Sequence, residues 1–218
     1  MLHLSEREQI VEYGKRLILE RLTNGTSGNL SIYDPQSDHM IISPSGIPYL
    51  ETKVEDVVVM EARTAKVVEG SRKPSSEWAL HIGFYLAEPS ARAVLHTHSA
   101  YATTFSCLHE PLRAVHYGIA AAGVETIPVA EYATFGTPAL SVNALKAIGR
   151  SKAVLLANHG LIGWDVSMPK VFSLIKEVEF MAELQYRALS IGKPIIIDSE
   201  EMARVIEKFK TYGQQPEV

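Results

Sequence analysis

The chain has 218 residues, 46% of them hydrophobic, with a formal net charge of -4 and a pI near 6.1. This charge gives no reason to expect nucleic acid or an acidic membrane as a partner, and no apolar run reaches the length of a membrane span. The single cysteine, Cys107, excludes an intramolecular disulfide and a cysteine-rich zinc site, so we expect a reducing cytoplasm as the compartment.

The first part of the chain predicts a helix, two pairs of strands and a second helix. A capping-box pattern over residues 5–8, followed by apolar residues at helical spacing, predicts a helix that ends at the turn of residues 23–25. Period-two patterns and turn residues predict strands at 28–33, 40–42, 57–60 and 65–68. The next helix is expected to begin at residues 76–78 and to reach Leu86.

The second part continues with a strand at 93–98 and a helix at 101–108. Pro138 opens a helix to about Gly149, an apolar strand follows at 153–156, and further helices are expected from Pro169 to before Gly192 and from 198 to 210. No repeat or linker divides the chain. We therefore expect one α/β domain over residues 1–218, with a central, largely antiparallel sheet flanked by helices and a mobile tail from about residue 211.

Three histidines form the most informative pattern. His96 and His98 are one residue apart on a predicted strand, so their side chains point to the same face. His159 follows a different apolar strand and could supply a third imidazole. Three protein ligands leave a position open for substrate or water, as in catalytic metal sites, and imidazole suits zinc or another first-row divalent ion. A lone buried histidine is more often a hydrogen-bonded core residue, and we interpret the remaining histidines as surface or packing residues: His3, His39, His81, His109 and His116.

Other segments combine glycine, small hydroxyls and an acid. Ser75, Ser76 and Glu77 precede a predicted helix, where plain N-capping would explain them. Beside a metal, the same residues would form an anion site with one carboxylate that acts as a ligand or general base. Residues 24–29 and 43–46 are either ordinary glycine turns or a phosphate cradle. Neither matches a P-loop or a Rossmann fingerprint, so the pattern favours a phosphorylated, oxygen-rich small molecule over a nucleotide.

These motifs, in this order, resemble the class II sugar-phosphate aldolase and epimerase family. The resemblance covers essentially the whole chain, and the matching segments are residues 25–29, 43–48, 74–77, 96–98 and 158–160. Within the family the chain is most similar to the L-fuculose-1-phosphate aldolases, through residues 116–117, 120–123, 132–137 and 208–213.

The resemblance implies roles for individual residues. One zinc ion per subunit would be bound by His96, His98 and His159, with Glu77 alternating between metal contact and proton abstraction. Tyr117 would reach the neighbouring subunit's site as a proton donor to the aldehyde oxygen. The resemblance also implies a catalytic role for a C-terminal tyrosine, Tyr212. It further implies a set of substrate-binding residues: Gly28, Asn29, Ser45, Gly46, Ser75, Ser76 and Phe135. The family aldolase is a homotetramer with sites between subunits.

The implied activity is that of a zinc-dependent aldehyde-lyase of fucose degradation, which reversibly cleaves L-fuculose 1-phosphate to dihydroxyacetone phosphate and L-lactaldehyde. Two enzymes on the same scaffold are alternatives: L-ribulose-5-phosphate 4-epimerase, which usually has aspartate at the position of Glu77, and methylthioribulose-1-phosphate dehydratase. A binding module like the adducin head is the non-enzyme alternative, and such a module would be expected to have lost the metal ligands that this chain keeps.

Overall fold

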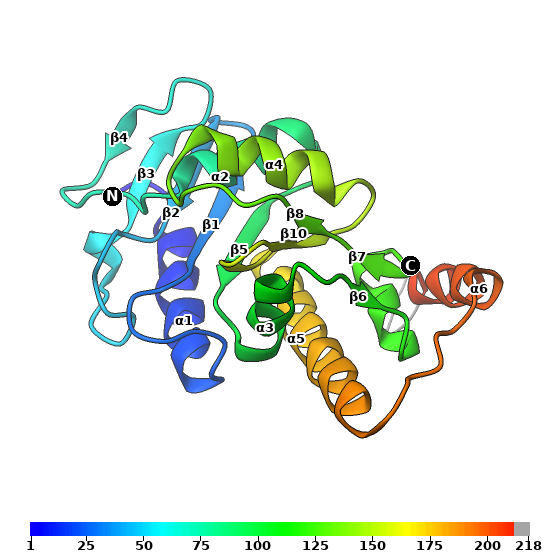
Figure 1. Ribbon diagram of the computed structural model, residues 1–218. Helices are drawn as coiled ribbons and strands as arrows, with labels where there is room; N and C mark the ends of the chain where they lie inside the picture. Colours follow the sequence, from blue (N-terminus) through cyan, green and yellow to red (C-terminus); the bar gives the residue numbers. More distant parts are fainter. Residues whose placement is uncertain (212–218) are drawn as a thin grey trace.

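The computed structural model describes residues 1–211, and it builds one main sheet with helices on both faces (Figure 1). The strands are β1 (Asn29–Asp34), β2 (His39–Ile42), β3 (Val58–Glu61), β4 (Val67–Glu69), β5 (Ala93–Thr97), β6 (Leu112–Arg113), β7 (Thr126–Ile127), β8 (Val129–Ala130), β9 (Ala153–Leu156) and β10 (Gly160–Asp165). The α-helices are α1 (Leu4–Leu19), α2 (Trp78–Ala87), α3 (Ala100–Leu108), α4 (Pro138–Ile148), α5 (Met168–Ile191) and α6 (Ser199–Phe209), and the 3-10 helices are η1 (Val54–Asp56) and η2 (Tyr117–Ala122).

The main sheet follows the order β4-β3-β2-β1-β5-β10-β9-β8, eight strands within residues 1–211. Neighbouring strands are antiparallel except β8 and β9, which run parallel. The short strands β6 and β7 pair with each other in a separate sheet. The prediction of a largely antiparallel central sheet flanked by helices is confirmed.

Two apolar cores lie on opposite faces of this sheet (Figure 1). Helices α1, α3 and α5 cover one face, and α2 and α4 cover the other. Along β5, Ala93 and Leu95 belong to the first core and Val94 to the second, as the alternation of a strand requires. By the same alternation, His96 points to the face that α2 covers. The fold therefore brings the end of β5 and the start of α2 to the same place.

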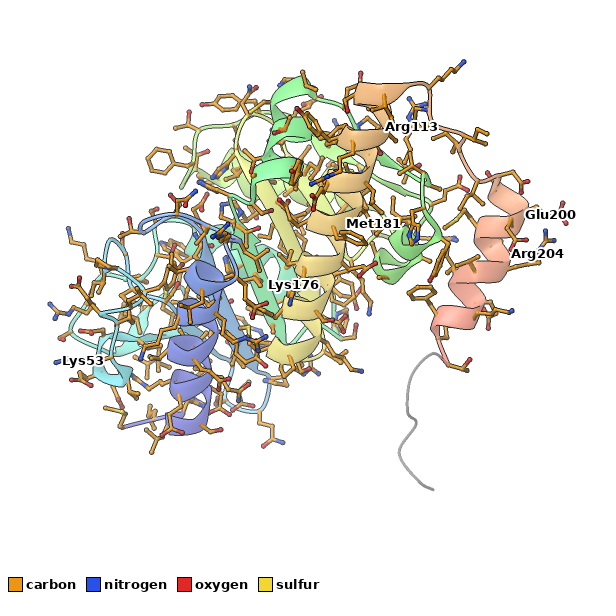
Figure 2. The ribbon with its side chains drawn as sticks, turned by 90° about the horizontal axis from the view of Figure 1, so that it is seen from below. Lys53, Arg113, Lys176, Met181, Glu200 and Arg204 are labelled. Atoms are coloured by element: carbon orange, nitrogen blue, oxygen red, sulfur yellow. The ribbon has the colours of Figure 1, made fainter. Side chains whose placement is uncertain are left out.

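Ion pairs tie the helices of the other face together. Figure 2 shows α1 and α5 side by side, with Lys176 of α5 between them; its Nζ lies 2.6 Å from Oε2 of Glu20 at the end of α1. The Glu179 carboxylate of α5 accepts hydrogen bonds from the backbone N–H groups of Tyr101 and Ala102, at 2.8 and 2.9 Å. These bonds satisfy free N–H groups in the first turn of α3, the helix that follows His98.

Two local predictions are wrong. Helix α1 begins at Leu4 with His3 as its N-cap, so residues 5–8 do not form a capping box. The buried Arg7 donates from Nε to the Leu2 carbonyl oxygen at 2.8 Å, which holds the chain in a turn before Ser5. The same helix ends at Leu19, before the predicted turn. By contrast, helix α6 begins close to its predicted start at residue 198, where the Asp198 side chain caps it by accepting from the Glu201 N–H at 2.8 Å.

No helix among residues 1–211 combines the length and the apolar character needed to cross a lipid bilayer. The predicted C-terminal tail beyond Thr211, with Tyr212, lies outside the described residues.

Candidate active site

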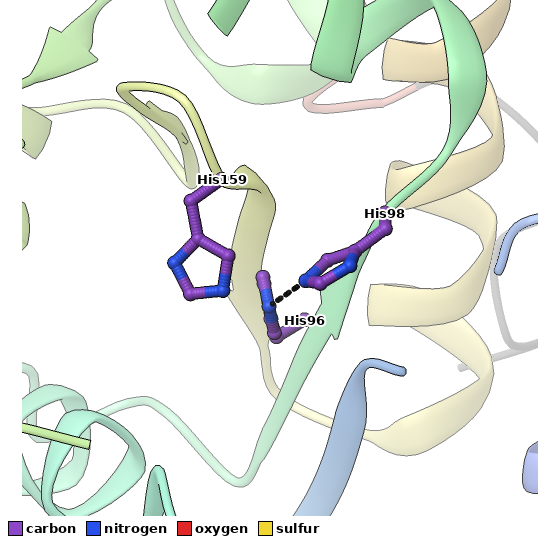
Figure 3. Close-up of side chains that lie close together, drawn as sticks. All are labelled: His96, His98 and His159. Carbon is purple, nitrogen blue, oxygen red and sulfur yellow. Dashed lines mark hydrogen bonds between the residues drawn. The ribbon is translucent and has the colours of Figure 1, made fainter. Parts of the chain in front are cut away.

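The three predicted metal ligands converge at one point (Figure 3). His96 comes from the end of β5, His98 follows that strand directly, and His159 comes from the turn between β9 and β10. Their potential ligand nitrogens lie within 4.8 Å of one another, and Nε2 of His96 is 3.1 Å from Nε2 of His98. The other ring nitrogen of His96, Nδ1, donates to the Leu161 carbonyl oxygen at 2.9 Å. This bond leaves Nε2 of His96 as the lone-pair atom that faces the other rings.

Burial lowers the pKa of two of these imidazoles, those of His96 and His98. Desolvation, with contributions from His159 and His98, holds the pKa of His96 well below its usual value of 6.5. Burial and His159 also lower the pKa of His98, against the opposing effect of the Glu77 carboxylate. A neutral imidazole is the form that binds a metal ion. Burial therefore favours the metal-binding form of the His96 and His98 rings.

Glu77 supplies a carboxylate to the same point. It is the buried N-cap residue of α2, with Oε2 3.4 Å from Nε2 of His96 and Oε1 3.5 Å from Nε2 of His159. Asn29 donates from Nδ2 to Oε2 at 2.8 Å, whereas Oε1 is buried with no hydrogen-bond partner in residues 1–211. A buried carboxylate oxygen without a partner is costly. Three convergent imidazoles and this oxygen fit a divalent cation bound between them.

A pocket of about 350 Å³ adjoins the cluster, and Glu77, His98 and His159 line it. Its other lining residues come from loops and strand ends: Thr26, Ser27, Gly28, Asn29, Pro44, Ser45, Gly46, Ser75, Ser76, Tyr132, Phe135 and Asn158. All seven predicted substrate-binding residues are in this set. Their assignment to phosphate or aldehyde remains a prediction, but the structure brings them together beside the predicted metal ligands.

Backbone pairing joins the two serine loops of the pocket. Ser45 donates its N–H to the Lys73 carbonyl oxygen at 2.9 Å, and Ser75 donates its N–H to the Ser43 carbonyl oxygen at 3.0 Å. The third loop contains Gly28 in a left-handed conformation, with φ of 77°, and a Cβ there would lie 2.6 Å from the His96 carbonyl oxygen. Glycine is thus required where this loop passes the metal ligands.

Of the two predicted catalytic tyrosines, the structure describes Tyr117, which does not line this pocket. Tyr117 is 53% exposed in η2 and lines a second pocket, of about 700 Å³, together with His116, Lys208 and Phe209. Tyr212 is outside the described residues. The catalytic role of each remains a prediction, and for Tyr117 that prediction involves a neighbouring subunit.

Sequence reasoning missed three residues around the site. Tyr132 and Asn158 line the pocket, although each was noted only as part of a motif. His81 is fully buried, and its Nε2 lies 2.5 Å from Oδ1 of Asn29. The sequence spacing could have indicated His81, because a residue four positions after Glu77 lies on the same face of the helix.

Gly160, the residue after His159, allows β10 to approach closely to β5, the strand that carries His96. A Cβ on Gly160 would lie 2.4 Å from the Thr97 carbonyl oxygen and 3.0 Å from Cδ2 of His98. We expect Gly160→Ala to force β10 away from β5, to lower the free energy of unfolding by about 1–3 kcal/mol and to weaken metal retention.

Urea denaturation and zinc content after dialysis measure both effects. Gly192→Ala is the matched control, since a Cβ there meets no described atom within 4 Å and its φ of 173° suits any residue. Wild-type stability and zinc content in Gly160→Ala would contradict this account of the strand contact.

Comparisons with known proteins identify the family of this chain. Residues 8–186 match the family model described as Class II Aldolase and Adducin N-terminal domain. The chain is 45% identical over 215 residues to 5-deoxy-D-ribulose 1-phosphate aldolase of Bacillus thuringiensis serovar kurstaki, covering 99% of this chain and 100% of that protein. It is 43% identical over 206 residues to L-fuculose phosphate aldolase of Escherichia coli O157:H7, covering 94% of each. A solved structure of L-fuculose 1-phosphate aldolase superposes with a TM-score of 0.92 at 44% identity, covering 94% of this chain and 96% of that one. The chain therefore belongs to the class II aldolases, metal-dependent lyases of carbohydrate metabolism.

Proposed function

We propose that this protein is a zinc-dependent aldolase that cleaves L-fuculose 1-phosphate to dihydroxyacetone phosphate and L-lactaldehyde. The observation that carries the proposal is one pocket that combines three convergent imidazoles, a buried carboxylate with a free oxygen, and loops rich in glycine and serine. The likeness to L-fuculose phosphate aldolases in sequence and structure supports the substrate.

The phosphate group of the substrate would lie among the glycine and serine loops. Within the described residues, the lining contains no lysine or arginine. Neutral donors would therefore hold the phosphate: the hydroxyls of Ser45, Ser75 and Ser76, and backbone N–H groups beside Gly28 and Gly46. The N-terminus of α2 starts directly after Ser75 and Ser76 and adds a favourable field for an anion.

Cleavage breaks the bond between C3 and C4 of the ketose. The C4 hydroxyl loses a proton as C4 becomes the aldehyde, and the electron pair of the broken bond moves to C3 and the adjoining carbonyl. In the protonated form, Glu77 would give a proton to C3 from Oε1 during cleavage, and the carboxylate would remove that proton during synthesis. Tyr117 of a neighbouring subunit would exchange the other proton with the aldehyde oxygen. A divalent cation held by His96, His98 and His159 would stabilise negative charge developing on the C2 and C3 oxygens.

A second candidate substrate is 5-deoxy-D-ribulose 1-phosphate, because a relative with that activity matches the chain over its full length. Both substrates contain the same three-carbon phosphate fragment. They differ in the departing aldehyde, which is lactaldehyde from one and acetaldehyde from the other. Only the part of the site that receives the aldehyde, which we assign to the surroundings of Phe135, would distinguish them.

The test is the rate of dihydroxyacetone phosphate release from each compound by the zinc-loaded protein. A higher kcat/KM with L-fuculose 1-phosphate supports the proposed substrate, and a higher value with 5-deoxy-D-ribulose 1-phosphate transfers the assignment to that compound. Release from neither would contradict the proposal, and epimerisation of L-ribulose 5-phosphate or dehydration of methylthioribulose 1-phosphate would then be tested.

We also propose that the chain is a single domain over residues 1–218 that assembles as a cytoplasmic homotetramer. The exposed position of Tyr117, in a pocket separate from Glu77, supports an active site completed by a second subunit.

A further inference from the structure

A chain of buried hydrogen bonds runs from Glu77 into the layer between β1 and α2. Asn29 Nδ2 is 2.8 Å from Glu77 Oε2, and Asn29 Oδ1 is 2.5 Å from His81 Nε2. The other nitrogen of His81, Nδ1, lies 2.6 Å from Ser31 Oγ, which lies 2.7 Å from the Tyr85 hydroxyl. All five side chains are buried, and His81 and Ser31 are fully so. Nothing in the chemistry proposed above uses the residues beyond Asn29.

The secondary structure explains how these residues meet. Asn29 and Ser31 are two apart on β1, so they point to the face of the sheet that α2 covers. Glu77 is the N-cap of α2, and His81 and Tyr85 follow at intervals of four residues. The three side chains therefore form one stripe of the helix, which faces β1. Two regular elements therefore hold the whole set.

The Glu77 end fixes the direction of the hydrogen bonds. Asn29 donates from Nδ2 to Oε2 of Glu77, so the other end of its amide, Oδ1, faces His81. Because Oδ1 only accepts, His81 carries its proton on Nε2, and Nδ1 accepts from the Ser31 hydroxyl. Burial lowers the pKa of His81 to about 3, so the ring is neutral and has a single N–H to donate.

We propose that His81 is a positioning residue for Glu77, acting through Asn29. The inference rests on the proposed function and deepens it. The N–H of His81 holds the Asn29 amide in the orientation that donates to Oε2 of Glu77. If the Asn29 amide rotated by half a turn, its Oδ1 would face Oε2 of Glu77 at about the present 2.8 Å, and the two acceptor oxygens would repel each other. With Oε2 anchored, Oε1 is the oxygen left to face the substrate carbon.

The experiment isolates the proton transfer assigned to Glu77. Zinc-loaded protein is incubated with dihydroxyacetone phosphate in D₂O without an aldehyde, and NMR follows loss of the proton from the hydroxymethyl carbon. His81→Asn and His81→Phe both remove the donor to Asn29, one by shortening the side chain and one by filling the space. We expect each to lower kcat for exchange by about 10–100-fold, with KM and bound zinc unchanged. His81→Gln can place its amide nitrogen where Nε2 lies, so it is expected to keep most of the wild-type kcat.

Tyr85→Phe is the control for loss of a buried polar group on the same stripe, and it is expected to lower stability without lowering kcat. Unchanged kcat in both His81→Asn and His81→Phe would overturn the inference. The inference would also be overturned if kcat fell in His81→Gln and Tyr85→Phe as far as in His81→Asn and His81→Phe. That result would indicate a general loss of packing between β1 and α2. Failure of wild-type protein to exchange the proton would instead reject the proposed function and, with it, this role.

Discussion

Glu77→Gln is expected to lower the rate of dihydroxyacetone phosphate release by about 10²–10⁴-fold while zinc remains largely bound. Glutamine has the same size, and its carbonyl oxygen can still accept the hydrogen bond from Asn29. It cannot carry a proton to or from the substrate carbon, which is the task assigned to Oε1 of Glu77. The three imidazoles, whose potential ligand nitrogens lie within 4.8 Å of one another, would continue to hold the metal. The measurement is kcat together with zinc content per chain.

The matched control is Glu8→Gln, which changes an exposed glutamate on α1 in the same way. Near-normal turnover in Glu77→Gln would reject Glu77 as the base. A variant that lost zinc together with turnover would instead identify Glu77 as an essential metal ligand.

His98→Ala is expected to remove both bound metal and turnover. Two imidazoles and one carboxylate would remain, and the metal site would lose one of the three predicted ligands that line the pocket. His98 is the better choice than His96 because it follows the end of β5, whereas His96 is fully buried and its truncation would also leave a cavity. Zinc content after dialysis against a weak chelator, and kcat at saturating zinc, report the two effects separately.

His39→Gln provides the comparison for removing a histidine from a strand. His39 lies on β2, and its Nδ1 is 2.9 Å from Nε2 of His3. Stoichiometric zinc in His98→Ala, at a level equal to that of His39→Gln, would reject the three-histidine site.

The sequence predicts the metal ligands because strand alternation is a strong constraint. Two histidines separated by one residue on an apolar strand must share a face, and β5 places His96 on the face that α2 covers. The position of Glu77 is predictable for a related reason, since proline, serine and acid before an apolar run mark the start of a helix. Both features depend on local sequence alone.

Features that depend on distant contacts are missed. Strand β10 is not predicted because Gly160 and Gly163 interrupt its short apolar run, and pairing with β5 and β9 makes it a strand. The position of His81 beside Asn29 depends on how α2 lies over β1.

Substrate choice is hard to predict for a chemical reason. The two candidate ketose phosphates present the same phosphate, carbonyl and hydroxyl groups to the metal and the serine loops. Their difference is confined to the aldehyde portion, which we propose to lie near Phe135, a residue that is 65% exposed in the single chain. Contacts supplied by another subunit would therefore add to the selectivity there.

The most direct test of the account is release of dihydroxyacetone phosphate from L-fuculose 1-phosphate by one preparation in three states: as purified, after removal of metal by a chelator, and after return of zinc. The account predicts that release disappears with the metal and returns with zinc. Release that persists in protein shown to be metal-free, or its absence from zinc-loaded protein, would contradict the central claim.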